Sequence, residues 1–485
     1  MIQNDGYAMG ALAIHRDSIV GAQYRLNAQP VNEILGFTEE WAEEFSAWAE
    51  TRFNLLSDSS ENWCDASEMN TLTGLVRLAV SGFVMTGEVL ATCEWKKRPD
   101  RPFYSAMQMV SPSRLSNPDG MPDTKTLRRG IEKDNYGAPI AYWIRKGHPG
   151  DILWDVDGYE WVRVNAYKPW GRRMVLHTIE QMQPDQSRGV ADMVAALKQM
   201  KMTSTFQDVT LQNAVVNASY AAAIESEMSP DLVREMMGAG PGQQTYAEVV
   251  QGFMDGLMGY VEAGGSVKVD GAKIPHLFPG TKLNMKPMGT PGGVGTTFEQ
   301  SLLRHIAATL GLSYEQFSRD YTNTNYSSAR ASMGETWKFM QSRKKLVGDN
   351  TANCMYRLWL EEELNRGNVP LPVGVTPAAF LKRFYADALV REAIFAASWI
   401  GASRVQVDEM KETQAAMLRM GAGLSTMEME TGRLGEDWRK VMRQKAREEA
   451  YAKKLGLTLN FSTQKPTAKS TASAGAADDE DDDEI

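Results

Sequence analysis

Cysteine and histidine are scarce in this sequence. Its 485 residues include three cysteines, Cys64, Cys93 and Cys354, which are far apart and form no CxxC motif. Reduced, structural thiols in a chain that folds in the cytosol are the simplest interpretation. The five histidines are scattered and show no HxxxH spacing, so the sequence predicts no zinc site.

Long apolar runs are also missing. The most apolar stretch, residues 78–87, lies between Arg77 and Glu88. It is too short to cross a bilayer, which requires about 20 apolar residues. Near the N-terminus the short segment ALAI leads directly into polar residues and does not resemble a signal peptide. The sequence therefore predicts neither membrane insertion nor secretion.

No recognisable enzyme motif is present. The glycines of PGGVGTTFE (291–299) precede a predicted helix, but the segment lacks the lysine of a Walker loop, so we interpret it as a hinge and a cap. The segment GAGPG (238–242) is interpreted as a loop, and GLSYE lacks the second glycine of a serine elbow. The acids at Glu361 and Glu363 are expected to form the solvated face of a helix. We expect no catalytic residues, metal or cofactor.

Excess charge is confined to the C-terminus. The formal net charge is −9, and the run from Asp478 to Glu484 supplies seven of these charges, which leaves about −2 for the rest. A nearly balanced body argues against a sequence-specific, high-affinity DNA binder, but it allows loose contact with DNA.

Periodicity predicts a mainly helical α+β protein. Residues 1–95 are predicted to be helical, because the aromatic residues of FTEEWAEEFSAWAETRFN recur at helical spacing. Residues 100–180 are predicted to be rich in short strands. The segment 191–227 has no Pro or Gly and predicts a continuous helix about 50 Å long, rich in alanine towards its end. Residues 376–456 are predicted to form shorter helices, and residues 457–485 to be disordered.

The segment 228–295 combines glycines and prolines with short strands around Val267 and Leu283. It also carries four lysines with few acids, and these are Lys268, Lys273, Lys282 and Lys286. Two interpretations remain open: edge-strand lysines that discourage aggregation, or a docking face for an acidic partner or a DNA backbone.

A second helix is predicted from residue 296, where Thr296 and Glu299 form a capping-box pattern. Its apolar residues fall four apart up to Gly311, and these are Phe298, Leu302, Ile306 and Leu310. Another helix is predicted over about 333–365. Between the two lies RDYTNTNYSSARAS (319–332), a soft polar segment with no charge run and no Gly-Pro punctuation.

Several segments resemble the portal proteins of lambda-type tailed bacteriophages. They are NDGYAMGALAIHRDSIVG, MVSPSRLSNP, PDQSRGVADM, KIPHLFPGTKLNM, FEQSLLRHIAATLGLSYEQFSRDYTNTNYSSARAS and VDEMKETQAAMLRMGAGLSTMEME. The resemblance covers about residues 1–456, and its most specific part is 298–332. Family members usually carry further residues before the segment that is here at 4–8, so a shortened or unusual start is expected.

The resemblance implies the phage portal fold, with wing, stem, clip and crown, assembling as a ring usually of twelve subunits. The implied regions are the wing (1–190), a wing and stem helix (191–227), the clip (228–295), a second stem helix (296–318), the tunnel loop (319–332), a long wing helix (333–375), the crown (376–456) and a disordered acidic tail (457–485).

The resemblance also implies the function and the partners. The ring would fill one vertex of the capsid in the virion, after assembly in the host cytoplasm, and conduct double-stranded DNA during packaging and ejection without reading its sequence. The implied partners are the terminase, which would supply the energy, the major capsid and scaffold proteins, and the head-completion or tail-adaptor proteins. The alternatives are a capsid adaptor or minor head protein without a channel, and a soluble enzyme with a polar lid at 319–332.

The tunnel loop implied by the resemblance would face DNA with a set of mostly uncharged side chains. This set is Arg319, Thr322, Asn323, Thr324, Asn325, Tyr326, Ser327 and Arg330. Hydroxyl and amide groups would make weak, exchangeable contacts and let the duplex slide, whereas many arginines would trap it. The two arginines would either steer DNA or pair with acids such as Asp320.

Overall fold

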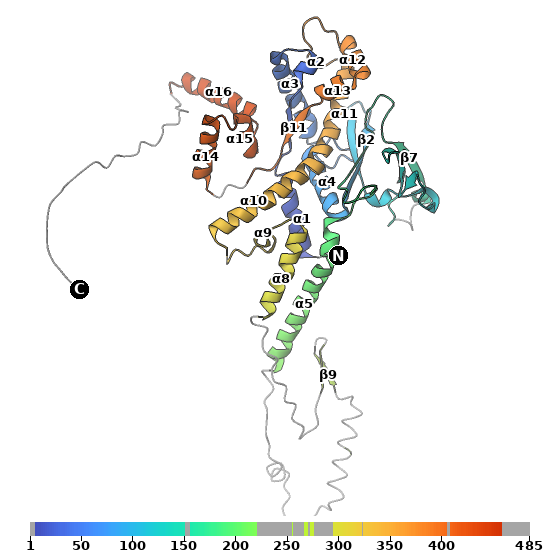
Figure 1. Ribbon diagram of the computed structural model, residues 1–485, viewed down its shortest axis with the longest axis vertical. Coiled ribbons are helices and arrows are strands. Elements are labelled where there is room, and N and C mark those ends of the chain that lie inside the picture. The colour runs from blue at the N-terminus through green and yellow to red at the C-terminus, as the bar shows by residue number, and fades with distance from the viewer. Residues whose placement is uncertain are drawn as a thin grey trace, which may run out of the picture. The chain divides into compact units, whose positions relative to one another are not determined.

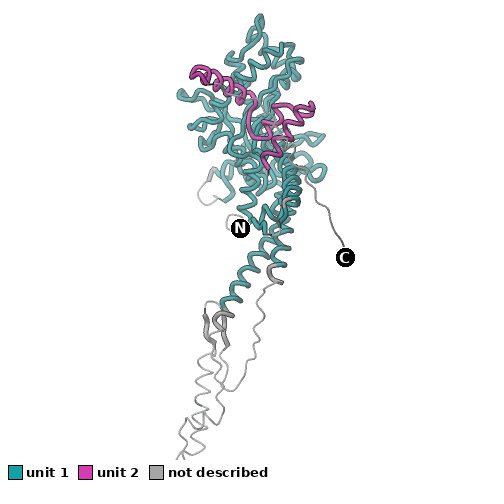
Figure 2. The backbone as a smooth tube through the Cα atoms, turned by 90° about the vertical axis from the view of Figure 1, so that its left-hand side faces the viewer, with its two compact units in different colours: residues 1–407 teal, residues 408–485 magenta. Residues whose placement is uncertain are grey.

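The computed structural model describes residues 5–150, 156–220, 255, 266–269, 272–275, 294–322, 324–404 and 408–457 (Figure 1). The chain divides into two compact units, 1–407 and 408–485 (Figure 2). Most of the predicted clip, with Lys282 and Lys286, and the predicted acidic tail from residue 458 lie outside the described residues.

Unit 1 combines helices with short antiparallel strands. Its helices are α1 (Gly6–Ile19), α2 (Asn32–Leu35), α3 (Glu39–Ser57), α4 (Leu72–Thr86), α5 (Asp192–Tyr220), α8 (Val294–Thr309), α9 (Tyr314–Ser318), α10 (Tyr326–Arg343), α11 (Asn350–Arg366), α12 (Pro377–Ala386) and α13 (Ala388–Ile394). Its strands are β1 (Arg25–Ala28), β2 (Glu88–Trp95), β3 (Ser105–Val110), β4 (Leu127–Arg128), β5 (Ile131–Lys133), β6 (Pro139–Arg145), β7 (Trp161–Asn165), β8 (Val175–Ile179), β9 (Ser266–Val269), β10 (Ala272–Pro275) and β11 (Ala397–Ile400). The predicted mainly helical α+β class is confirmed.

The main core of unit 1 surrounds α11. Tyr356 and Trp359 of this helix are fully buried. Phe53 of α3 contacts both rings edge-on, with centroids 5.6 and 5.2 Å away, and Trp48 stacks on Trp359 at 5.8 Å. Aromatic pairs in these geometries add to the free energy gained by burying their large apolar surfaces. The aromatic stripe predicted from FTEEWAEEFSAWAETRFN therefore packs against a helix about 300 residues further along the chain.

The β-rich region predicted over 100–180 is confirmed, as two sheets with strand orders β3-β2-β8 and β4-β5-β6-β7. The central strand of the first sheet, β2, lies within residues 1–95, so the prediction that this whole segment is helical was wrong. Helix α4 ends before β2 because Gly87 adopts a left-handed conformation, with φ of 81°. Gly189 packs directly against it, since a Cβ at Gly189 would lie 1.9 Å from the carbonyl oxygen of Gly87. The chain therefore turns sharply into the sheet.

The acids of α11 are buried, so the prediction of a solvated face was wrong. Glu361, Glu362 and Glu363 are 4%, 2% and 0% exposed. Each has its own partners: Glu361 pairs with Arg172 at 2.7 Å, Glu363 pairs with Arg52 at 2.9 Å, and Glu362 accepts two backbone N–H groups where the chain enters β3, each at 2.8 Å. Buried carboxylates are tolerated when cations and N–H donors satisfy their oxygens.

Helices α5 and α8 lie side by side (Figure 1). Phe206 and Phe298 meet edge-on at 5.5 Å, and the amide of Gln207 donates a hydrogen bond of 2.7 Å to Glu299. The predicted capping box is corrected, because α8 begins at Val294 rather than after Thr296 and the Glu299 carboxylate binds the neighbouring helix.

The apolar face predicted for the second helix is confirmed over most of its length. Leu302, Ile306 and Leu310 are buried, whereas Phe298 is 46% exposed. The helical stretch ends at Gly311, whose φ is 67° and where a Cβ would lie 2.6 Å from the ring of Phe339. Only glycine fits both the left-handed backbone and this close approach.

The helix predicted over about 333–365 begins earlier, at Tyr326, and is interrupted in the middle, and the long wing helix that the resemblance extends to residue 375 ends at Arg366. Helix α10 and helix α11 are joined by a π-helical turn, Lys344–Asp349, and α11 ends at Gly367, whose φ is 71°. In the turn, Asp349 accepts hydrogen bonds from the Tyr24 hydroxyl at 2.5 Å and from the Lys344 ammonium at 2.9 Å. These contacts with a distant tyrosine stabilise an irregular turn that apolar periodicity does not predict.

The shorter helices predicted over 376–456 are confirmed, and they divide between the two units. Strand β11 pairs antiparallel with β1, with Ala397 opposite Ala28, and this pairing places residues 376–400 in unit 1. Unit 2 contains α14 (Glu409–Gly421), α15 (Met427–Arg433) and α16 (Trp438–Lys454). Arg419 of α14 donates two hydrogen bonds of 2.9 Å to Glu430 of α15, which hold the pKa of this carboxyl at about 2.

Candidate functional site

The segment 319–332 is a loop only up to Asn325. The side chain of Asn325 accepts the backbone N–H of Ser328 at 2.8 Å and caps α10, so Ser327 and Arg330 are exposed positions of a helix. Asparagine is among the strongest N-caps, and Ala329 and Ala331 after it favour a helix. We call residues 319–325 the α9–α10 loop from here on.

Asp320 organises the first half of this loop. Its Oδ1 atom accepts the hydroxyl of Thr322 at 2.6 Å and the backbone N–H of the same residue at 3.0 Å, and its Oδ2 atom accepts the Tyr314 hydroxyl at 3.3 Å. These bonds, above all the one from the Thr322 hydroxyl, hold the pKa of Asp320 below its usual value. Sequence analysis missed this role, which the pattern Asp-x-Thr could have indicated as a side-chain turn.

Residues 321–325 of the loop carry no charged side chain. Tyr321 is 47% exposed, Thr322 and Asn325 are exposed, and Thr324 is half-buried with its backbone N–H donated to the carbonyl of Tyr321 at 3.2 Å. Asn323 and the side chain of Tyr326 lie outside what the structure describes. A surface of hydroxyl, amide and backbone groups can donate and accept hydrogen bonds without holding a phosphate by charge.

The two arginines of the segment differ in position. Arg319 has a left-handed backbone, with φ of 60°, and ends α9, whereas Arg330 lies one turn inside α10. With the other described residues, neither guanidinium forms an ion pair. The pairing with Asp320 that the sequence left open is therefore not seen, and Asp320 is occupied by Thr322 and Tyr314 instead.

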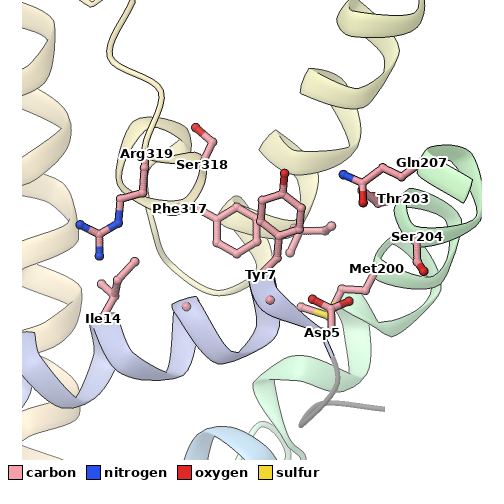
Figure 3. A pocket seen from close by; sticks show the side chains of 13 residues that line it. Asp5, Tyr7, Ile14, Met200, Thr203, Ser204, Gln207, Phe317, Ser318 and Arg319 are labelled. Carbon is pink, nitrogen blue, oxygen red and sulfur yellow. The ribbon is translucent and has the colours of Figure 1, made fainter. Parts of the chain in front are cut away.

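A cavity of about 460 Å³ lies beside the loop, between α1, α5, α8 and α9 (Figure 3). Phe317 and Tyr7 line it with their rings 5.5 Å apart, and Arg319 lies at its edge. Burial raises the pKa of Tyr7. The cavity wall mixes apolar side chains with polar and charged ones, such as Thr203, Gln207 and Asp5.

The lysines of the predicted docking face are only partly described. Strands β9 and β10 pair antiparallel, and Lys268 and Lys273 are direct register partners. This hairpin confirms the strand predicted around Val267. In the described part of the chain, no cluster of three or more His, Cys, Asp or Glu side chains could hold a metal ion, and no helix is long and apolar enough to span a membrane.

Comparison with known proteins adds sequence relatives and structural neighbours. Among solved structures, a chain of the virion of a native gene transfer agent particle matches with a TM-score of 0.38 and 12% identity, covering 88% of this chain and 89% of that chain. A chain of the neck of an empty particle of this kind matches with a TM-score of 0.38 and 11% identity, covering 90% and 91%.

Sequence relatives are much closer. The portal protein of Escherichia phage N15 is 35% identical over 458 residues, which cover 94% of this chain and 84% of that protein. Portal protein B of Escherichia phage lambda is also 35% identical over 458 residues, covering 94% and 83%. A probable portal protein of Halomonas phage phiHAP-1 is 21% identical over 395 residues. The family model described as phage portal protein, lambda family, matches residues 1–344. The chain therefore belongs to the lambda family of phage portal proteins, as its sequence segments indicated.

Proposed function

We propose that this chain is a portal subunit: a dodecameric ring at one capsid vertex conducts double-stranded DNA during packaging and ejection. The observation that carries the proposal is the 35% identity to two portal proteins over 94% of the chain. The ring belongs to the virion and assembles in the host cytoplasm. Its role is structural, and the terminase supplies the energy of translocation.

The proposed regions follow the family plan, with boundaries adjusted to the structure. The wing contains the core around α11 and the two sheets, and the stem consists of α5 and α8. The clip, with β9 and β10, docks the terminase and later the head-completion or tail-adaptor proteins. Helices α14, α15 and α16 form the crown. Capsid and scaffold proteins contact the ring from outside.

Exposed apolar residues on α5 support assembly. Val194, Val209 and Leu211 are 55%, 57% and 66% exposed in the single chain. In a ring of identical subunits, one surface of each chain contacts a different surface of the next. Burying apolar side chains in such contacts is favourable by about 25 cal/mol per Å² of apolar surface.

Electron micrographs of the purified chain test the ring. We expect class averages of a closed ring with an open centre, because a channel requires copies that surround an opening. Rotational symmetry in these averages gives the subunit number. A chain that stays monomeric, or that forms particles with a filled centre, would contradict the proposal and favour a capsid adaptor without a channel.

The α9–α10 loop is proposed to face the DNA as the tunnel loop. We expect the double variant Thr322→Arg/Thr324→Arg to assemble into rings and to package at least tenfold less DNA. Each added cation makes phosphate contacts in every subunit, and such contacts increase affinity and slow sliding. The measurement is the amount of DNA protected from nuclease after packaging in vitro with terminase.

Thr51→Arg/Thr126→Arg is the matched control, because both threonines are exposed and lie outside the loop. It adds the same charge and is expected to package normally. Asn325 is left unchanged in both variants, since it caps α10. Normal packaging by the loop variant would show that the loop does not touch the DNA.

A further inference from the structure

Helix α16 carries a strong positive charge. It contains seven basic residues and two acids, and the acids are Glu448 and Glu449. None of its residues between Met442 and Tyr451 is buried, so the charge lies at the surface of unit 2. The helix therefore presents a field that attracts an anionic partner.

Most of these basic residues share one face of α16. Lys440, Arg447 and Lys454 are seven residues apart, and seven residues are close to two helical turns. Arg439 and Arg443 fall within about 80° of Lys454 at about 100° per residue. We call this set the basic face: Arg439, Lys440, Arg443, Arg447 and Lys454. The buried Ala452 lies on the other side of the helix.

The same chain carries an anion of matching size. The run from Asp478 to Glu484 contains seven acids and no base. It supplies seven of the nine net negative charges of the chain. A contact between seven carboxylates and the basic face would place opposite charges close together along much of the helix.

The length of the chain permits this contact. Helix α16 has 17 residues and is about 25 Å long. Residues 458–477 connect its end to the acidic run, and that many residues can span up to about 70 Å. The acidic run can therefore reach every turn of the helix from which it starts.

We propose that the basic face of α16 is a docking site for the acidic C-terminal segment 478–484 of the same chain. The segment covers the basic face and competes with other polyanions for it. Packaged or cellular nucleic acid would otherwise bind the Lys and Arg side chains of the basic face without regard to sequence. This docking does not depend on the proposed DNA channel.

Tethering makes even a weak contact effective. A segment joined by a short linker has an effective concentration in the millimolar range. A site with a dissociation constant of about 100 μM would then be about 90% occupied, and a free peptide would bind the full chain about tenfold more weakly than a chain without the segment. The contact should also weaken strongly with salt, since it is made between exposed charges.

A labelled peptide with the sequence of residues 471–485 tests the proposal in fluorescence anisotropy at low salt. We expect it to bind a variant that ends at Ala477 at least tenfold more tightly than the full chain. A full-length variant with Asp478–Glu484 changed to the corresponding amides should bind the peptide as tightly as the truncated variant. It keeps the chain length and changes only the charge.

The site itself is tested in the variant that ends at Ala477. The triple variant Lys440→Glu/Arg447→Glu/Lys454→Glu should weaken peptide binding at least tenfold. The control Lys445→Glu reverses one charge on another side of α16, and its loss of peptide affinity per reversed charge should be much smaller. Equal peptide binding by the full and truncated chains would overturn the proposal. So would peptide binding that survives the triple change, or a truncated chain that binds duplex DNA but not the peptide.

Discussion

Replacing Glu361 by alanine is expected to lower the unfolding free energy of unit 1 by about 3–5 kcal/mol, the range for breaking a buried ion pair. The side chain of Glu361 is 5% exposed and pairs with Arg172 through two hydrogen bonds, of 2.7 and 2.8 Å. It also accepts the indole N–H of Trp170 and the hydroxyl of Tyr385, both at 3.0 Å. Alanine would leave a half-buried guanidinium and two donors without their acceptor.

Glu392→Ala is the matched control. Glu392 also pairs with an arginine, Arg357, but the two side chains are 60% and 39% exposed. An exposed pair contributes about 0–1 kcal/mol, because water solvates both charges in either state. Urea unfolding followed by tryptophan fluorescence compares the two variants. Equal losses of stability would mean that Glu361 is no more important than a surface acid.

The burial of Glu361 illustrates what sequence analysis could not provide. Helical periodicity identified the stretch correctly, because apolar spacing is a local property. Whether an acid on that helix faces water depends on partners elsewhere in the chain, and Arg172 lies 189 residues away. A single sequence shows no sign of that pairing. The same holds for Asp349, whose partner Tyr24 lies 325 residues away.

Elements with strictly local causes were predicted well. The face of Leu302, Ile306 and Leu310 and the stop at Gly311 follow from spacing and from glycine chemistry. Strand β2 was missed because its residues are almost all buried, and such a strand lacks the alternation of a half-exposed one. The preceding apolar helix made the boundary harder to see.

Sequence analysis predicted where the candidate site lies in the chain, at 319–332, but not how that segment folds. Composition identified 319–332 as unusual, and the resemblance assigned its role. The cap at Asn325 and the turn at Asp320 were available from local sequence chemistry. The orientation of these side chains towards a channel depends on how copies of the chain surround it in a ring. Neither the sequence nor a single subunit determines that orientation.

Acidification is expected to weaken the attachment of α1 to α8 through His15. This ring is fully buried, and its Nε2–H donates a hydrogen bond of 3.0 Å to the carbonyl of Leu310, at the end of α8. The Nδ1 atom has no hydrogen-bond partner among the described residues. Burial is the main cause that lowers the pKa of His15 to about 4, and the nearby Arg343 lowers it further.

The sign of the effect follows from proton binding. An unfolded histidine has a pKa of about 6.5 and binds a proton at pH values where buried His15 does not. Protonation therefore favours the unfolded state between about pH 6.5 and pH 4, and stability falls as the pH is lowered through this window. The slope is at most about 1.4 kcal/mol per pH unit, and the total loss is about 3 kcal/mol. Below about pH 4 both states are protonated and the loss stops growing.

His15→Gln isolates this contribution, because glutamine can still donate to Leu310 but does not titrate. We expect the difference in unfolding free energy between the natural chain and this variant to change by about 3 kcal/mol from pH 7 to pH 4, to the disadvantage of the natural chain. Carboxylates that titrate in the same range affect both proteins and cancel in the difference. Parallel curves for His15→Gln would mean that water reaches this ring in the folded protein and that the contact between α1 and α8 is not closed as the structure has it.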